Sequence, residues 1–282
     1  MDGLLVINKP KGMTSFDCIA ILRKKLGIKK IGHTGTLDKE VSGVLVICIG
    51  KATKLVDILV DHEKIYECTL KLGFKTKTDD IYGEIIEEKN PLNHSNLEID
   101  EALNSFIGEY MQTPPMYSSI KVNGKKLYQY ALKNIDIDLT PRKITIYDLK
   151  RTSDLINNEF NFTVRSSKGL YVRTLCSDIA SKLNELGCMK ELKRVKLGDY
   201  SIDEAITLDE VEESKIIPLE AVIDKFPKVE VKDYLIPLIK NGITLDNRQT
   251  DIKEVFAVTN NNKMLALYKP VEDNKYKPVI IL

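Results

Sequence analysis

The chain has 282 residues, which is enough for one large domain or for a large domain and a small one. Hydrophobic residues make up 43% of it and charged residues 29%, a composition typical of a soluble protein with a sizeable core. A net charge of +1 excludes a polycation, and no apolar run reaches the roughly eighteen residues that a membrane span needs.

Strands and helices are mixed in the N-terminal half. A helix is predicted from Thr14, a good N-cap residue, to Gly27, a good C-cap residue. Continuous apolar runs predict buried strands, and alternation of apolar and polar residues predicts a half-buried one. These strands are expected over residues 3–8, 43–49 and 66–72, with a second helix over residues 52–60.

The C-terminal half begins in the same way and then changes character. Leu175, Ile179, Leu183 and Leu186 recur at helical spacing, which predicts a helix over residues 170–186. No regular strand–helix repeat is visible, so the pattern favours an α+β fold with a mostly antiparallel sheet. Further strands are expected near residues 144–149 and 160–165, and then over residues 255–258, 264–268 and 278–282.

The change of character places a domain boundary near Asp224. An acidic segment precedes this point and only short strands follow it. We therefore expect a larger domain over residues 1–224 and a small β-rich domain over residues 225–282.

The cysteines and the N-terminus predict a cytoplasmic protein. The five cysteines are scattered and form no C-x-x-C pair, which indicates reduced thiols rather than zinc ligands or disulfides. The first residues lack a basic start followed by an apolar run, so no signal peptide is expected. The three histidines have no metal-ligand spacing, so no metal site is predicted.

Basic residues gather in two stretches although the net charge is near zero. Residues 9–30 contain seven Lys or Arg against one acid, and residues 121–143 contain six against two. Such segregation suits a protein that docks one face on a polyanion, but it also fits ordinary solvated helix faces.

The densest chemistry lies in residues 32–43, GHTGTLDKEVSG. Its glycines let the backbone approach a ligand closely, and Asp38 supplies a single carboxylate. The other interpretation is a tight loop in which Asp38 accepts hydrogen bonds from local amides. The residues alone leave both interpretations open.

This loop resembles the catalytic loop of the bacterial tRNA pseudouridine synthase B (TruB) family, whose typical form is GHTGTLDPxATG. Five more segments resemble motifs of that family in the same order, and together they extend along nearly the whole chain. They are NKPKGMTS at 8–15, KIYECTLKLGFKTKTDDIYG at 64–83, QTPPMYSSIKVNG at 112–124, SKGLYVRTLCSD at 167–178 and LKRVKLG at 192–198.

The resemblance implies a fold and a function. The fold would be an α+β pseudouridine synthase core with a mixed, mostly antiparallel sheet and a small C-terminal PUA-like RNA-binding domain. The function would be isomerisation of uridine-55 in the T-arm loop of tRNA, without a metal or organic cofactor. The partner would be tRNA, and no protein partner is evident.

The resemblance also implies roles for individual residues. Asp38 matches the catalytic aspartate, and Arg173 matches the arginine that pairs with it. Tyr66 matches a tyrosine that stacks on the bound uracil. His33 matches a residue that helps to displace the target base. The implied substrate-binding residues are His33, Tyr66, Tyr171, Leu192 and Lys9.

Elementary chemistry agrees with these roles. A base must leave its stack before its glycosidic bond can react, at a cost of a few kcal/mol. An aromatic ring such as Tyr66 can recover about 1–3 kcal/mol by stacking on it. A guanidinium such as Arg173 keeps a carboxylate ionised and in place. Whether Asp38 attacks the sugar or abstracts its 2′ proton is left open by the sequence.

Two departures from the family pattern leave a second function open. Lys39 stands where the family usually has Pro, and Leu170 replaces the usual Thr. Because an extended segment points successive side chains to opposite sides, an inward Asp38 predicts an outward Lys39. The alternative to an active synthase is a non-catalytic tRNA-binding or tRNA-folding protein on the same scaffold.

Overall fold

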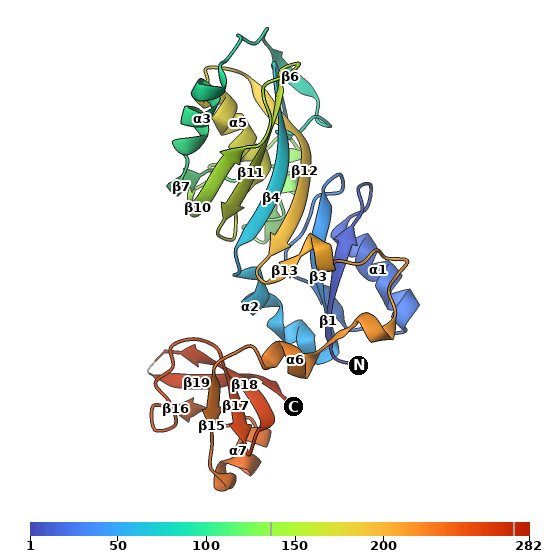
Figure 1. Ribbon diagram of the computed structural model, residues 1–282, viewed down its shortest axis with the longest axis vertical. Coiled ribbons are helices and arrows are strands. Elements are labelled where there is room, and N and C mark those ends of the chain that lie inside the picture. Colours follow the sequence, from blue (N-terminus) through green and yellow to red (C-terminus); the bar gives the residue numbers. More distant parts are fainter. Residues whose placement is uncertain (136, 273) are drawn as a thin grey trace.

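A ten-stranded mixed sheet organises most of the molecule (Figure 1). The computed structural model describes residues 1–282 except residues 136 and 273. The main path runs β14-β1-β3-β12-β4-β11-β10-β7, with β2 beside β3 and β13 beside β12, and only β12 and β3 are parallel. This confirms the predicted α+β class. The strands are β1 (Gly3–Lys9), β2 (Ile31–His33), β3 (Ser42–Ile49), β4 (Lys64–Leu72), β7 (Gly108–Gln112), β10 (Arg142–Arg151), β11 (Glu159–Ser166), β12 (Gly187–Leu197), β13 (Tyr200–Ser201) and β14 (Ile217–Pro218).

Helix α1 (Ser15–Leu26) begins and ends where the sequence predicted. The Thr14 hydroxyl accepts from the amide of Asp17, and the Asp17 carboxylate accepts from the amide of Thr14. Gly27 ends the helix in the left-handed region at φ 68°. Local capping chemistry therefore fixes both ends.

Two other predicted helices differ from the structure. The segment 52–60 is a 3-10 helix, η1 (Gly50–Leu55), followed by the short helix α2 (Val56–Val60). Helix α5 (Val172–Lys182) is shorter than predicted, because Asn184 adopts φ 57° and β12 begins at Gly187. Leu186 falls at helical spacing in the sequence but lies beyond the end of the helix.

The two faces of β1 and β3 pack against different layers. On one face, Leu5, Ile7, Leu45 and Ile47 join the main core, which includes α1, α5 and α3 (Asn96–Asn104). On the other face, Leu4, Val6, Val44, Val46 and Cys48 pack against η1, α2 and α6 (Leu219–Ile223). Strand alternation thus builds two cores from one strand pair.

The C-terminal segment forms a second sheet that shares the second core. The strand order is β15-β17-β18-β19-β16, and Ala257, Leu267 and Ile280 pack into the core beneath β1 and β3. Both termini lie near this junction (Figure 1). The boundary at Asp224 and the PUA-like relationship stay predictions. The elements are β15 (Lys228–Glu230), η4 (Asp233–Leu235), α7 (Ile236–Lys240), β16 (Leu245–Asp246), β17 (Phe256–Asn260), β18 (Lys263–Val271) and β19 (Lys275–Ile281).

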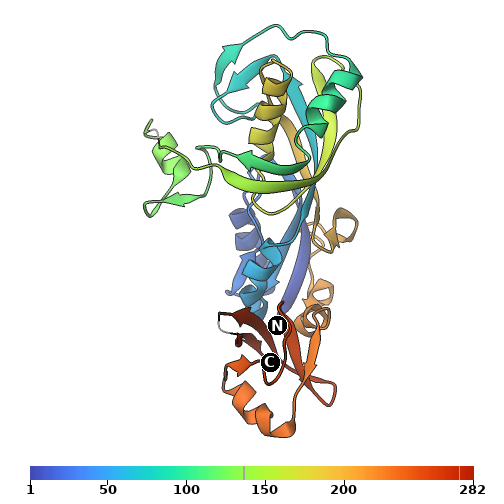
Figure 2. The ribbon, with the colours of Figure 1, turned by 90° about the vertical axis from the view of Figure 1, so that its left-hand side faces the viewer.

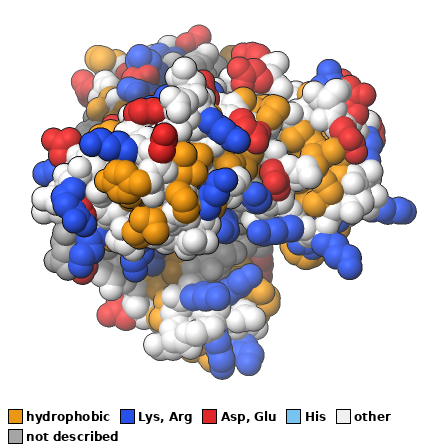
Figure 3. All heavy atoms as spheres, turned by 90° about the horizontal axis from the view of Figure 1, so that it is seen from below, with side chains coloured by type: hydrophobic (Ala, Val, Ile, Leu, Met, Phe, Trp, Pro, Cys, Tyr) orange, Lys and Arg blue, Asp and Glu red, His pale blue; other side chains and the backbone are white. Residues whose placement is uncertain are grey.

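Seen from below, the C-terminal domain has no uniform charge. Lys and Arg side chains are interspersed there with acidic and hydrophobic ones (Figure 3). In the described part of the chain no helix is both long and apolar enough to cross a bilayer.

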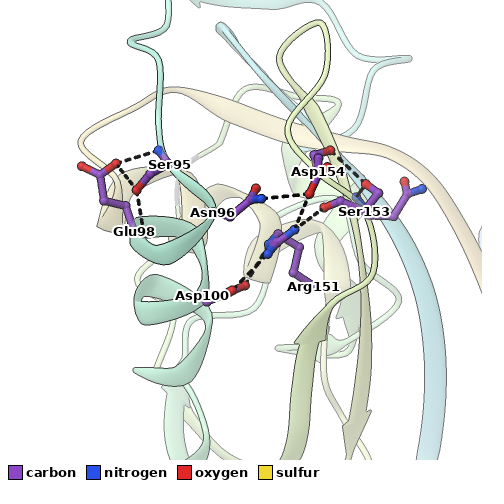
Figure 4. A network of polar contacts seen from close by, with 8 residues as sticks. Ser95, Asn96, Glu98, Asp100, Arg151, Ser153 and Asp154 are labelled. Atoms are coloured by element: carbon purple, nitrogen blue, oxygen red, sulfur yellow. Dashed lines mark hydrogen bonds and ion pairs between the residues drawn. The ribbon is translucent and has the colours of Figure 1, made fainter.

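Smaller elements surround the large sheet. Arg151 ties α3 to the β10–β11 turn, because its Nε and Nη2 donate to the Asp100 carboxylate at 2.8 and 3.1 Å and its Nη1 donates to Asp154 at 3.2 Å (Figure 4). The described residues of the segment 119–141, which are 119–135 and 137–141, form an arm that projects away from the sheet (Figure 2). The remaining elements are β5 (Phe74–Thr76), β6 (Ile85–Glu88), β8 (Lys121–Val122), β9 (Lys125–Lys126), α4 (Leu127–Ala131), η2 (Ile202–Glu204) and η3 (Glu213–Lys215).

Candidate active site

A cavity of about 100 Å³ lies where the loop between β2 and β3 meets the start of α5. It brings together five of the seven residues proposed from the sequence, although they come from four separate segments of the chain. Those five are Asp38, Tyr66, Tyr171, Arg173 and Leu192. The rest of the lining is Thr36, Leu37, Val41, Leu170 and Val172.

Arg173 holds the carboxylate at the mouth of the cavity. Its Nε lies 3.0 Å from Oδ2 of Asp38. Its Nη1 donates to the carbonyl of Thr78 and its Nη2 to the carbonyl of Tyr117, each at 2.9 Å. The Arg173 side chain is only 8% exposed, and each of its three nitrogens contacts an acceptor in the protein.

The Asp38 side chain is 51% exposed. Water can leave this carboxylate only when a ligand covers it. The protein therefore orients the carboxylate of Asp38, and a bound ligand would be needed to exclude water from it.

The loop carrying Asp38 is held from behind by buried donors. Ser15 Oγ accepts from the amide of Leu37 at 2.9 Å and donates to its carbonyl at 3.3 Å. The carbonyl of Lys39 accepts from Lys9 Nζ at 3.2 Å and from the amide of Gly12 at 2.9 Å. The carbonyl of Gly35 accepts from Arg194 Nη2 at 3.3 Å. These bonds to carbonyls 35, 37 and 39 fix the backbone on both sides of Asp38, whose side chain lines the cavity.

Lys39 faces solvent, as predicted, but the reason differs from the predicted one. The chain is not extended after Asp38, since the amide of Val41 donates to the carbonyl of Asp38 at 3.1 Å and closes a β-turn. Lys39 occupies the second position of this turn, where proline is favoured. The usual proline of the family pattern therefore fits the same backbone.

The walls of the cavity are held as firmly as the loop. Tyr66 on β4 and Leu192 on β12 are both buried and extend from one face of the sheet. Gln112, itself buried, accepts from the amide of Tyr171 at 2.8 Å and donates to its carbonyl at 3.0 Å. This clamp sets the start of α5 and hence Arg173 two residues later. Burial raises the pKa of the Tyr171 hydroxyl, which keeps it neutral.

Comparison with known proteins places this geometry in a family. Residues 23–172 match the model of the TruB family pseudouridylate synthase N-terminal domain, and residues 173–238 match that of the tRNA pseudouridylate synthase B C-terminal domain. The chain belongs to the TruB family. The residues matched by the N-terminal family model include the whole loop of residues 34–41.

Curated TruB relatives cover the full length of the chain. Two proteins named tRNA pseudouridine synthase B, from Bacillus pumilus (strain SAFR-032) and Bacillus subtilis (strain 168), are 43% and 41% identical over 100% of this chain and 98% of their own length. A protein of the same name from Clostridium perfringens (strain SM101 / Type A) is 41% identical over 97% of this chain.

Solved structures share the fold. A crystal structure of a Cbf5-Nop10-Gar1 complex contains a chain that is 25% identical, with a TM-score of 0.72 over 99% of this chain and 84% of that one. A chain in an H/ACA RNP bound to a substrate RNA containing 2′-deoxyuridine is 23% identical, with a TM-score of 0.70 over the same shares.

Two residues that the TruB resemblance singled out do not line the cavity. Lys9 is fully buried behind the loop, where its Nζ also donates to the carbonyls of Pro10 and Met13 at 2.8 and 2.5 Å. His33 is half-buried on β2, and burial followed by the charge of Arg194 lowers its pKa. Their predicted contacts with substrate stay predictions, and in the free protein Lys9 has the contacts of a residue that holds the loop.

Sequence reasoning missed three residues that build this site. Gln112, Ser15 and Arg194 touch the backbone of the site rather than its cavity. All three stood inside segments that resembled TruB motifs, which was the available signal. Among the described residues, no cluster of three His, Cys, Asp or Glu could hold a metal ion.

Proposed function

We propose that the chain is a tRNA pseudouridine synthase that isomerises uridine-55 in the T-arm loop, with Asp38 as its catalytic carboxylate. The observation that carries the proposal is the Asp38–Arg173 pair at the mouth of a small cavity walled by Tyr66 and Leu192. Relatives about 40% identical over the full chain bear the name tRNA pseudouridine synthase B, which supports tRNA as the substrate.

The reaction needs what this cavity offers. The C1′–N1 bond of the uridine breaks, the base turns, and a C1′–C5 bond forms; C5 loses a proton and N1 gains one, so the atoms balance without a co-reactant. Tyr66 offers a ring on which the detached base can stack. Asp38 faces the sugar in either route, whether it attacks C1′ or removes the 2′ proton. A seated nucleotide would also cover the exposed Asp38 and dry the site.

The experiment is to incubate the chain with unmodified tRNA and map pseudouridine position by position. Wild-type protein is expected to modify position 55 and no other uridine of the T-arm. Asp38→Asn should lower the rate by about 10³-fold or more while tRNA affinity stays within threefold. Asp57→Asn, at an exposed carboxylate on α2, is the matched control and should behave as wild type. Tight binding without any product from wild-type protein would favour the tRNA-folding alternative.

A further inference from the structure

A second, wider cleft of about 480 Å³ joins the base cavity. The two share Thr36, Asp38, Tyr66, Leu170, Tyr171 and Arg173. Beyond these, the cleft is lined by three further cations, Lys64, Lys168 and Arg194, and by Ser118, Tyr117 and Tyr128. Asp38 is the one carboxylate in this lining, and Arg173 already holds it.

Lys64 is a buried cation with a spare donor. It stands on β4 two residues before Tyr66, so both side chains lie on the same face of the sheet. The residue is 6% exposed, and its Nζ donates to the carbonyls of Val60 and His62, each at 2.8 Å. An ammonium has three N–H groups, so one remains. Across residues 1–135, 137–272 and 274–282, no carboxylate pairs with it.

Arg194 is the second buried cation, directly across the strand pair from Tyr66. The residue is 1% exposed. Its Nε donates to the carbonyl of Val44 at 2.8 Å and its Nη2 to the carbonyl of Gly35 at 3.3 Å. In the described part of the chain, Arg194 too has no carboxylate partner. Lys168 differs, since its Nζ lies 2.6 Å from Asp61.

Two buried cations without a counter-charge are costly to keep beside each other. Carbonyl dipoles offset part of that cost, but an anion would offset more of it. The donors suit an anion that only accepts: an ammonium, a guanidinium, and the hydroxyl of Ser118, which is buried beside the Tyr171 hydroxyl. An RNA phosphate is such an acceptor, and it is always present next to a nucleotide.

We propose that Lys64 and Arg194 form the binding site for the RNA backbone phosphate adjoining the uridine that occupies the base cavity. This inference rests on the proposed function, because it takes the ligand to be RNA. The phosphate would fix the sugar of the reacting nucleotide relative to Asp38, which makes Lys64 and Arg194 positioning residues. Tyr128, at the rim of the same cleft, offers a ring to the neighbouring base.

Binding of a phosphate at this site should change the protonation state of Lys64. Burial first, and then the charges of Arg194 and Lys168, lower the pKa of Lys64 to about 8, against the opposing effect of Asp61. A phosphate against this ammonium raises its pKa again. Above this pKa a share of the free protein has Lys64 neutral, so RNA binding at pH 8.5 takes up part of a proton at this residue. At pH 6.5 the lysine is already charged and this uptake disappears.

The first experiment measures affinity and proton uptake for a T-arm stem–loop RNA, by calorimetry in buffers of different ionisation enthalpy. The Asp38→Asn background prevents turnover during the measurement. Lys64→Met should bind about tenfold more weakly and lose the uptake at pH 8.5. Lys64→Arg should keep affinity within threefold and also lose the uptake, because arginine stays charged. Lys182→Met, an exposed lysine near the far end of α5, is the charge-matched control and should change neither quantity.

A second experiment removes the charge from the RNA instead. Methylphosphonate linkages are placed singly on the 5′ side of the target uridine, on its 3′ side, and in the stem. One of the two adjacent linkages should weaken wild-type binding about tenfold and weaken Lys64→Met binding much less, which is the coupling expected of a direct contact. The stem linkage should weaken both proteins equally. Thermal unfolding checks that each variant is folded.

The outcomes separate this inference from the proposed function. If RNA binds with the predicted uptake but no pseudouridine forms, the phosphate site stands and the proposed activity fails. If pseudouridine forms but Lys64→Met matches the Lys182→Met control in affinity and uptake, the activity stands and the phosphate site is overturned. Equal losses from the neutral linkages in wild type and Lys64→Met would also overturn it.

Discussion

The loop of residues 34–41 and the arm of residues 119–141 are opposite kinds of structure in one protein. In the loop, Thr34, Leu37 and Val41 are buried, and the buried side chains of Arg194, Ser15 and Lys9 donate to the carbonyls of residues 35, 37 and 39. In the arm, Leu127 is the one buried residue among those the structure describes. The arm projects from the sheet edge and keeps to its own short β8–β9 hairpin (Figure 2). The loop fixes the position of Asp38, whereas the arm has few buried contacts that would hold it in one position.

Arg173 holds Asp38, the carboxylate of the loop, through an ion pair at 3.0 Å. Arg173→Lys keeps the positive charge, but a single nitrogen cannot reach Asp38, Thr78 and Tyr117 together, which Arg173 contacts with three separate nitrogens. We expect the single-turnover rate to fall by about 10²-fold with tRNA affinity nearly unchanged. Rapid-quench assays at saturating enzyme measure this rate. A lysine variant within threefold of wild type would show that charge alone is sufficient.

Tyr66 tests whether the cavity wall acts through its ring or its hydroxyl. Tyr66→Ala should weaken binding or reaction by about 10- to 100-fold, since stacking contributes about 1–3 kcal/mol. Tyr66→Phe should stay within threefold in binding. Affinity and single-turnover rate are measured for both variants. If the phenylalanine variant proves as inactive as alanine, the hydroxyl takes part in the chemistry.

The arm should affect binding and not chemistry. Lys121 and Lys125 are both exposed on its hairpin. Changing both to Gln should weaken RNA binding by about tenfold at low salt and make the salt dependence shallower by about two phosphate contacts. The rate at saturating RNA should not change. Lys182→Gln is the control, and a fall in the saturated rate of the double variant would contradict the division of labour.

The smallest effect is expected at Lys39. Proline fits the second position of the turn closed by Val41, so Lys39→Pro should leave turnover within a few-fold and lower salt sensitivity slightly. It should also stabilise the protein by about 0.4–1 kcal/mol, by restricting the unfolded chain. Turnover assays and thermal unfolding check both points. A large gain in turnover would mean that the lysine had impaired the site.

Local chemistry made parts of the fold predictable. The caps of α1, Thr14 and Gly27, can be recognised from their residue types. Strands β1 and β3 can be predicted from their apolar runs. The predicted end of α5 was wrong. Leu186 has helical spacing in the sequence, but the chain leaves the helix before it because Gly187 pairs with Leu72 on β4. Contacts between distant segments decide such ends.

Contacts between distant segments also limited what could be predicted about the site. The residues that face the cavity could be taken from the resemblance, since their side chains carry the chemistry. Lys9, Lys64 and Arg194 could not be recognised as buried, because the carbonyls that satisfy them belong to loops and strands folded around them. The half-exposed position of Asp38 could not be predicted either, because exposure depends on how the surrounding segments pack.

Hydrogen exchange of the free protein and of its complex with T-arm RNA tests the contrast between the loop and the arm most directly. The amides of Leu37 and Val41 in the loop should exchange slowly in the free protein and change little on binding, because their acceptors are already in place. Amides of the arm, such as that of Leu132, should exchange quickly in the free protein, because the bond from Leu132 to the carbonyl of Tyr128 lies in an exposed short helix, and should become protected in the complex. Loop amides that exchange as fast as those of the arm until RNA binds would contradict a preorganised catalytic loop.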